Sequence, residues 1–199
     1  MRFNMEPLHL FSDKHFLDLY PSTFRVANRM HYTPIEVVKK AASFLCQEKK
    51  TTILDIGSGI GKFCIPAASL FPENKFVGIE LRPDLNEAAI EVKDKLGLSN
   101  VTLLQGDIVK FPLASYNHFY FFNAFYEFRE NAEKLDQQLE FTPGNYQKYH
   151  AYIFRSLEKM PIGTKLATFF TEDKWIPASY VEVENHFDFT LKHWMKIQD

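Results

Sequence analysis

Three glycines at alternate positions, Gly57, Gly59 and Gly61, form the strongest chemical signal in this sequence. They follow the apolar segment 52–56, whose pattern predicts a short buried strand. Glycine allows a tight turn from strand to helix and lets the backbone approach a ligand closely. The helix that follows offers unpaired N–H groups at its start. The pattern therefore predicts a ligand-binding loop; the alternative is a turn that only connects two elements.

Two acidic residues accompany this loop. Glu80 ends a second predicted strand, 75–80, where a carboxylate can accept hydrogen bonds from both hydroxyls of a ribose. Asp55 lies two residues before the loop, where it would repel a pyrophosphate but suit an ammonium or a sulfonium. In the G-x-G-x-x-G fingerprint of nicotinamide-dependent dehydrogenases the third glycine would stand at the position of Lys62. The charges favour a cationic ligand, with a dehydrogenase as the rival interpretation.

The surrounding pattern alternates strands with helices. A helix from the loop through residue 70 follows the first strand, although Pro66 would remove one of its internal hydrogen bonds. A further helix starts at Pro83 and stops at Gly97, and strands are predicted at 101–105, 118–122 and 165–170, with a helix at 146–157 between the last two. This order predicts an α/β domain with a mainly parallel sheet.

The two ends of the chain differ from the middle in their sequence patterns. Residues 12–19 predict a short helix, and Thr33-Pro34-Ile35-Glu36 predicts a capping box for a helix that ends near Glu48. Alternating apolar residues predict a C-terminal strand over 187–197, which can pair antiparallel with 180–184. The sheet should therefore finish with an antiparallel strand at its C-terminal edge.

The segments 53–61, 76–80, 104–108 and 121–123 together resemble the class I S-adenosylmethionine-dependent methyltransferases. The resemblance covers residues 51–122 well and the remainder by the order of elements. It implies a Rossmann-like methyltransferase fold with a seven-stranded sheet. Residues 1–50 would form an N-terminal helical cap of the same domain, and residues 51–199 the core that binds S-adenosylmethionine.

The resemblance also implies roles in cofactor binding. Glu80 would hold the ribose hydroxyls, Asp107 would reach the adenine amino group with the Ile108 backbone nearby, and Leu81 would pack on the adenine face. The methionine end would lie against Asp55 and the glycine loop, which includes Ser58.

Tyr32 lies in a segment, 31–34, that is similar to one preceding the cofactor loop in N6-adenine methyltransferases. It would serve as a lid on the cofactor, although the capping box by itself accounts for Thr33 and Pro34.

The run Asn123-Ala124-Phe125-Tyr126 follows a predicted strand at the edge where parallel α/β sheets bind their ligands. It partly resembles the Asn-Pro-Pro-Tyr segment of amino-methyltransferases and differs at both prolines. The resemblance implies that Asn123 and Tyr126 are catalytic and orient a nitrogen nucleophile. The alternative for Asn123 is a turn cap. The aromatic residues around this run could stack on a planar substrate or pack between strand and helix, and Glu127, Glu130 and Glu133 predict a solvated helix face.

The composition sets limits on partners. The 199 residues carry a net charge of -2, which excludes a protein that binds nucleic acid mainly through phosphates and favours a protein or small-molecule methyl acceptor. Neither the two cysteines nor the seven histidines show metal-ligand spacing, so no metal site is expected. Without a membrane segment, the protein is expected to be soluble and cytoplasmic. The alternatives are a non-catalytic module that binds S-adenosylmethionine or a nucleotide, and an N6-adenine-type nucleic-acid methyltransferase.

Overall fold

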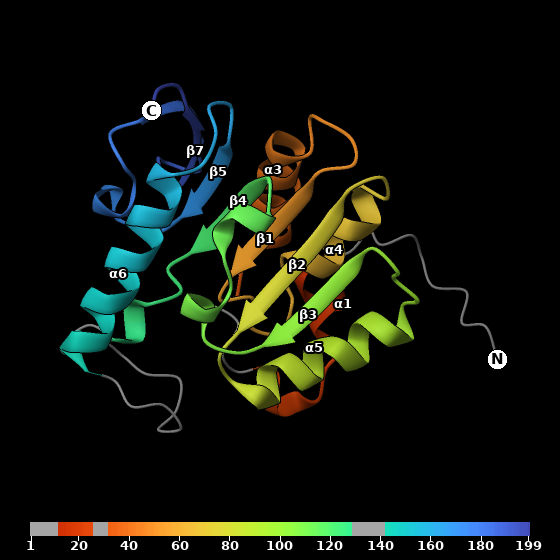
Figure 1. Ribbon diagram of the computed structural model, residues 1–199. Coiled ribbons are helices and arrows are strands. Elements are labelled where there is room, and N and C mark those ends of the chain that lie inside the picture. The colour runs from red at the N-terminus through yellow and green to blue at the C-terminus, as the bar shows by residue number, and fades with distance from the viewer. Residues whose placement is uncertain (1–11, 26–31, 129–141) are drawn as a thin grey trace.

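A seven-stranded sheet is the centre of the computed structural model, which describes residues 12–25, 32–128 and 142–199 (Figure 1). Its strands are β1 (Thr52–Ile56), β2 (Lys75–Glu80), β3 (Val101–Gln105), β4 (His118–Phe122), β5 (Lys165–Phe169), β6 (Tyr180–His186) and β7 (Leu191–Lys196). The strand order is β3-β2-β1-β4-β5-β7-β6. β1 to β5 pair in parallel, and β7 is antiparallel to both β5 and β6.

The sheet confirms the predicted fold class. The antiparallel C-terminal strand is present, although β7 lies inside the sheet and β6 forms its edge. Dinucleotide-binding dehydrogenases have the order 3-2-1-4-5-6. An antiparallel strand inserted beside β5 departs from that order, so the topology argues against the dehydrogenase interpretation.

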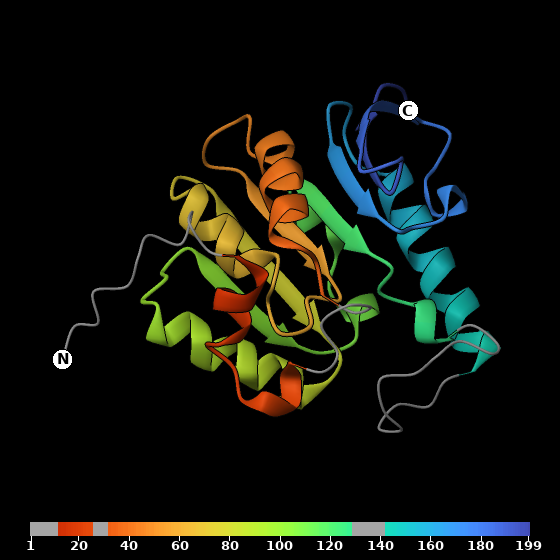
Figure 2. The ribbon, with the colours of Figure 1, turned by 180° about the vertical axis from the view of Figure 1, so that it is seen from behind.

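Helices cover both faces of the sheet (Figures 1 and 2). α3 (Ile35–Leu45) and α4 (Cys64–Leu70) pack on one face, α6 (Pro143–Glu158) packs on the other, and α5 (Pro83–Lys95) lies along β2 and β3. Successive residues of a strand point to opposite faces. Ile53 of β1 accordingly enters the core under α3 and α4, whereas Leu54 enters the core under α6. None of the described helices is long and apolar enough to cross a membrane.

The start of α3 differs from the prediction. Pro34 is its N-cap and no side chain caps it, so the capping box is wrong, and the helix ends at Leu45 rather than near Glu48. The Thr33 hydroxyl instead forms a hydrogen bond with the Tyr120 hydroxyl at 3.0 Å. The Ile35 N–H donates to Asp13 Oδ1, at 3.1 Å, from the short helix α1 (Asp13–Leu17). Partners that are distant in sequence satisfy these groups, which local spacing cannot show.

The C-terminal strand is also shorter than predicted. Phe187, Asp188 and Phe189 have φ angles of 53°, 54° and 64°, which form a left-handed turn between β6 and β7. Phe170 has a φ of 47° and ends β5 one residue early. A left-handed residue cannot continue an extended strand, so both predicted strands were longer than the observed ones.

Two helix details differ as well. Pro66 is the third residue of α4, and the Ile65 and Ala67 N–H groups beside it donate to the Gly61 and Phe63 carbonyls, so the hydrogen bond that Pro66 lacks falls at the very start of the helix. α6 begins at Pro143 rather than near Tyr146, and the Thr142 side chain accepts a hydrogen bond from the Asn145 N–H as its N-cap.

Candidate functional site

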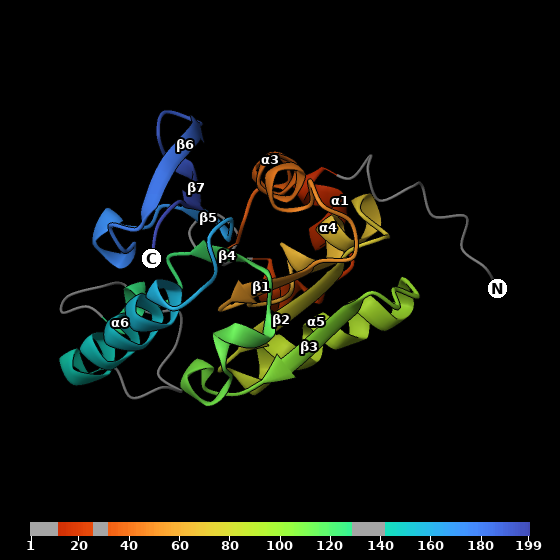
Figure 3. The same cartoon turned by 45° about the horizontal axis from the view of Figure 1, so that its top comes forward.

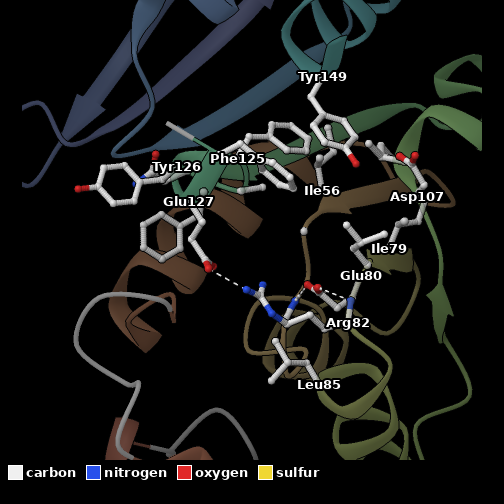
Figure 4. Close-up of a pocket in the computed structure, with 18 of the residues that line it drawn as sticks. Ile56, Ile79, Glu80, Arg82, Leu85, Asp107, Phe125, Tyr126, Glu127 and Tyr149 are labelled. Carbon is white, nitrogen blue, oxygen red and sulfur yellow. Dashed lines mark hydrogen bonds and ion pairs between the residues drawn. The ribbon is translucent and has the colours of Figure 1, made fainter. Parts of the chain in front are cut away.

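A pocket opens at the carboxyl ends of β1, β2 and β4 (Figure 4). It encloses about 910 Å³ of empty space, including its open mouth. Most of the predicted site residues line it: Tyr32, Gly57, Gly59, Glu80, Leu81, Asp107, Ile108, Asn123 and Tyr126. Segments far apart in the sequence therefore meet where a parallel sheet places its ligand crevice.

Glu80 connects the glycine loop to the start of α5. Its Oε2 accepts a hydrogen bond from the Gly59 N–H at 2.8 Å, and its Oε1 accepts one from the Arg82 N–H at 2.9 Å. Burial raises the pKa of the Glu80 carboxyl, and the two backbone donors partly offset that rise. A carboxylate has about four lone-pair sites. Glu80 can therefore accept further hydrogen bonds without giving up those it has.

The three loop glycines meet different surroundings. A Cβ on Gly57 would lie 2.5 Å from the Ala124 Cβ, and one on Gly61 would lie 3.0 Å from Ile65 Cδ1. Among the described residues, a Cβ on Gly59 would have only Tyr32 Cε1 within 4 Å, at 3.9 Å. Gly57 and Gly61 thus allow close packing within the protein, and Gly59 faces more open space.

Asp55, Ser58 and Gly61 do not line the main pocket. Asp55 and Ser58 line a smaller cavity together with Lys62, and Tyr32 and Gly57 line both spaces. The Asp55 Oδ2 accepts a hydrogen bond from the Cys64 thiol at 3.6 Å, and burial raises the pKa of Asp55 to about 8. The Lys62 ammonium is 3% exposed and pairs with Asp13 at 2.6 Å. Asp55 and Lys62, whose charged groups are both buried, therefore both line the smaller cavity.

The raised pKa of Asp55 makes the stability of the cofactor-free protein depend on pH. From the ordinary value of 3.8 up to about 8, the folded state holds a proton on Asp55 that the unfolded state has lost. The stabilisation that this proton gives to the folded state is complete below pH 3.8 and falls as the pH rises toward about 8. Between pH 6 and 7 we expect a loss of up to about 1.4 kcal/mol, or about 3–6 °C in Tm.

Thermal melts at several pH values measure this effect. Asp55→Asn should flatten the dependence over this range, whereas Asp94→Asn on the exposed side of α5 should leave it intact. A wild-type slope that survives in Asp55→Asn would show that another group is responsible.

Asn123 occupies a strained turn after β4. Its φ is 42°, a left-handed conformation that asparagine tolerates better than most residues. Its backbone N–H donates to Thr171 Oγ1 at 3.3 Å, and its carbonyl accepts a hydrogen bond from the Tyr126 N–H at 2.9 Å. Within the described part of the chain, the Asn123 side-chain amide has no hydrogen-bond partner. The backbone thus shapes the turn, and the amide remains available to a ligand.

An ion pair that sequence reasoning missed forms one wall of the pocket. Arg82 Nη2 donates to Glu127 Oε2 at 2.7 Å, and the two side chains are 8% and 13% exposed (Figure 4). The prediction that Glu127 belongs to a solvated helix face is therefore wrong, because a partner 45 residues away draws the carboxylate inward. Glu130 and Glu133 lie outside the described residues.

The opposite wall is aromatic. The Phe125 ring stacks on Tyr149 of α6 with centroids 4.6 Å apart, and it also stacks on Trp175 at 5.2 Å. Tyr149 reaches the pocket beside Asp107 (Figure 4). Burial, followed by the nearby Asp107 charge, raises the pKa of Tyr149 to about 12. Tyr120, by contrast, stacks on Phe63 in the core, so the predicted aromatic cluster divides between pocket and core.

Residues 47–158 match a family model described as a methyltransferase domain. Curated proteins with similar segments include the tRNA (guanine-N(7)-)-methyltransferase of Synechococcus sp. (strain JA-3-3Ab), 46% identical over 55 residues, which are 28% of this chain and 23% of that protein. The enzyme of the same name from Cupriavidus necator is 31% identical over 96 residues, which are 45% of this chain and 36% of that protein. The matches span about a quarter to a third of these relatives.

Solved structures share the fold. An RNA methyltransferase from Salinibacter ruber in complex with S-adenosyl-L-homocysteine has a TM-score of 0.57 and 23% identity, covering 84% of this chain and 94% of its own. TrmN from Thermus thermophilus has a TM-score of 0.59 and 14% identity, covering 87% and 51%.

The tRNA-modifying relatives overturn the expectation that the acceptor is a protein or small molecule rather than a nucleic acid. Net charge averages over the whole surface, and it does not report how a single base is recognised in a pocket.

Proposed function

Because this chain belongs to the methyltransferase-domain family, we propose that it transfers the methyl group of S-adenosylmethionine, the cofactor of that family, to a nitrogen of an RNA base. A guanine in tRNA is the first candidate, since the curated relatives carry that activity in their names. The observation that carries the proposal is the available Asn123 amide in a pocket with an aromatic wall. An unpaired base offers two flat faces for stacking and polar edges for hydrogen bonds.

The adenosine part of the cofactor would occupy the main pocket. Glu80 would accept hydrogen bonds from the ribose hydroxyls through its remaining lone pairs. Asp107 would accept one from the adenine amino group beside the Ile108 backbone, and Leu81 would cover the adenine face. Burial of the Glu80 carboxylate beside a glycine loop supports this fit.

The methionine part would extend toward the smaller cavity, where its two charged groups find opposite charges. Lys62 would attract the carboxylate, and Asp55 would lose its proton and face the cationic end. Tyr32 lines both spaces, which supports a role as a lid between the N-terminal segment and the cofactor.

Catalysis would depend on alignment. The bound cofactor supplies an electrophilic methyl group on a positively charged sulfur, and an aromatic nitrogen can displace that sulfur without a proton transfer. Guanine N7 and O6 are neighbouring acceptors, so the Asn123 amide can donate to O6 and direct N7. Tyr126, in the turn that Asn123 begins, would border the same base. Aromatic rings near the methylated base would stabilise its new positive charge.

Methyl transfer to purified RNA tests the proposal. Cofactor with a labelled methyl group is incubated with the protein and total tRNA, with tRNA digested by nuclease, and with RNA-free protein extract. We expect label in intact tRNA, and strand scission after borohydride and aniline treatment would map it to 7-methylguanine. Label found only in the protein extract would contradict an RNA acceptor but would still demonstrate methyltransferase activity.

A further inference from the structure

The far edge of the sheet brings three metal-ligating side chains together: Glu184 and His186 of β6, and His193 of β7. β6 and β7 lie at the opposite end of the sheet from β3 (Figure 3). Residues two apart on a strand share a face, and an irregularity between Glu182 and Glu184 pairs Glu184 with His193 across the strands. The three ligand atoms all lie within 4.8 Å of one another.

The Glu184 carboxylate contacts both rings, so a small shift of the partly exposed His186 and Glu184 side chains would bring one atom of each residue to ligand spacing. The Glu184 carboxylate lies between the rings, with Oε1 3.1 Å from His186 Nε2 and Oε2 3.1 Å from His193 Nδ1. Zinc binds imidazole nitrogen and carboxylate oxygen at about 2.0–2.2 Å in tetrahedral geometry, so neighbouring ligand atoms are about 3.3 Å apart. We propose that Glu184, His186 and His193 form a zinc site, with water as the fourth ligand.

The site is partly preorganised. His193 is 1% exposed, and its ring stacks on Phe44 of α3 with centroids 4.4 Å apart and an interplanar angle of 3°. Its Nε2 is buried, so Nδ1 is the nitrogen that faces the other ligands. The side chains of His186 and Glu184 are 19% and 54% exposed, which leaves a path for an ion and a water molecule.

One feature limits the affinity. In the metal-bound state a neutral His193 carries its proton on Nε2, which has no partner among the described residues. Such a missing outer contact typically costs 10–100-fold in metal affinity, so we expect micromolar binding. None of the three residues lines the main pocket. The ion would be structural: it would fasten β6 to β7 and, through the stack on Phe44, hold both against α3.

The metal-ligand spacings typical of helices do not occur in this cluster. Glu184 and His186 are two residues apart, which is the spacing of ligands on a strand. The third ligand comes from the neighbouring strand, and only pairing brings it close.

Zinc titration of the full chain, purified without a polyhistidine tag and stripped with chelator, tests the site. We expect one equivalent to bind by calorimetry with a micromolar Kd. At a hundredfold excess over Kd, Tm should rise by about 5–10 °C. Magnesium should not bind, because it prefers oxygen ligands.

Variants separate this site from incidental binding. His186→Asn and Glu184→Gln should each weaken zinc binding at least tenfold, whereas Glu182→Gln on the same strand should not. Because both replaced side chains are partly exposed, these variants are expected to fold. Stripped wild-type protein that binds no zinc, or a His186→Asn variant that binds it equally well, would overturn the proposal. The test is independent of methyl transfer.

Discussion

Replacing Asn123 with alanine should slow methyl transfer about 10²-fold while cofactor affinity changes by no more than about twofold. The Asn123 amide is available in the pocket, and an interaction that orients the acceptor acts mainly in the transition state. A misplacement of about 1 Å costs a reaction of this kind about 10²-fold. Single-turnover transfer to tRNA at saturating cofactor measures the effect directly.

The left-handed backbone of Asn123 requires a second variant. Alanine at a φ of 42° is itself strained, whereas glycine adopts that conformation freely. Asn123→Gly should therefore be as slow as Asn123→Ala if the amide matters, and near wild type if only the turn matters. Ser99→Ala, in an exposed bend before β3, should leave the rate unchanged.

Replacing Glu80 with glutamine should weaken S-adenosylhomocysteine binding by at least tenfold. Hydrogen bonds to a charged group contribute about 1.5–3 kcal/mol, and glutamine keeps the size of the side chain but loses the charge. In the variant, the NH₂ group of the glutamine would also face one of the two backbone N–H groups that now donate to Glu80, and two donors cannot form a hydrogen bond. Calorimetry measures the affinity.

A control variant tests whether the effect depends on where the negative charge is removed. Glu87→Gln on the exposed face of α5 removes the same charge and should bind the cofactor normally. If a folded Glu80→Gln protein retains wild-type affinity, Glu80 does not contact the ribose.

The parts of the site that sequence predicted best are local. β1 runs directly into the glycine loop, α4 leads from the loop to β2, and the parallel pairing of β1 with β2 brings Glu80 back to Gly59. Each of these predictions depends on a short segment in which the residue types favour one local structure: an apolar strand, a glycine turn or an acidic residue at a strand end. The positions of Leu81, Asp107 and Asn123 at the pocket follow from the same rule, because parallel strands end at one edge.

What sequence could not predict depends on partners far away in the chain. Thr33 matches a capping pattern, yet its hydroxyl contacts Tyr120 on β4. Glu127 lies in a charged run, yet Arg82 draws it into the pocket wall. Phe187 and Phe189 continue an apolar alternation, yet a left-handed turn separates them from β7. In each case tertiary contacts or backbone strain override a local preference.

The contact between Gly57 and Ala124 connects two parts of the site. With no room for even a methyl group at Gly57, the glycine loop rests directly on the turn that carries Asn123. A shift of the loop on cofactor binding would displace that turn, and the proposed cofactor and acceptor sites would then be thermodynamically linked. Linkage is reciprocal. If the bound cofactor changes the affinity for the acceptor by some factor, the bound acceptor changes the affinity for the cofactor by the same factor.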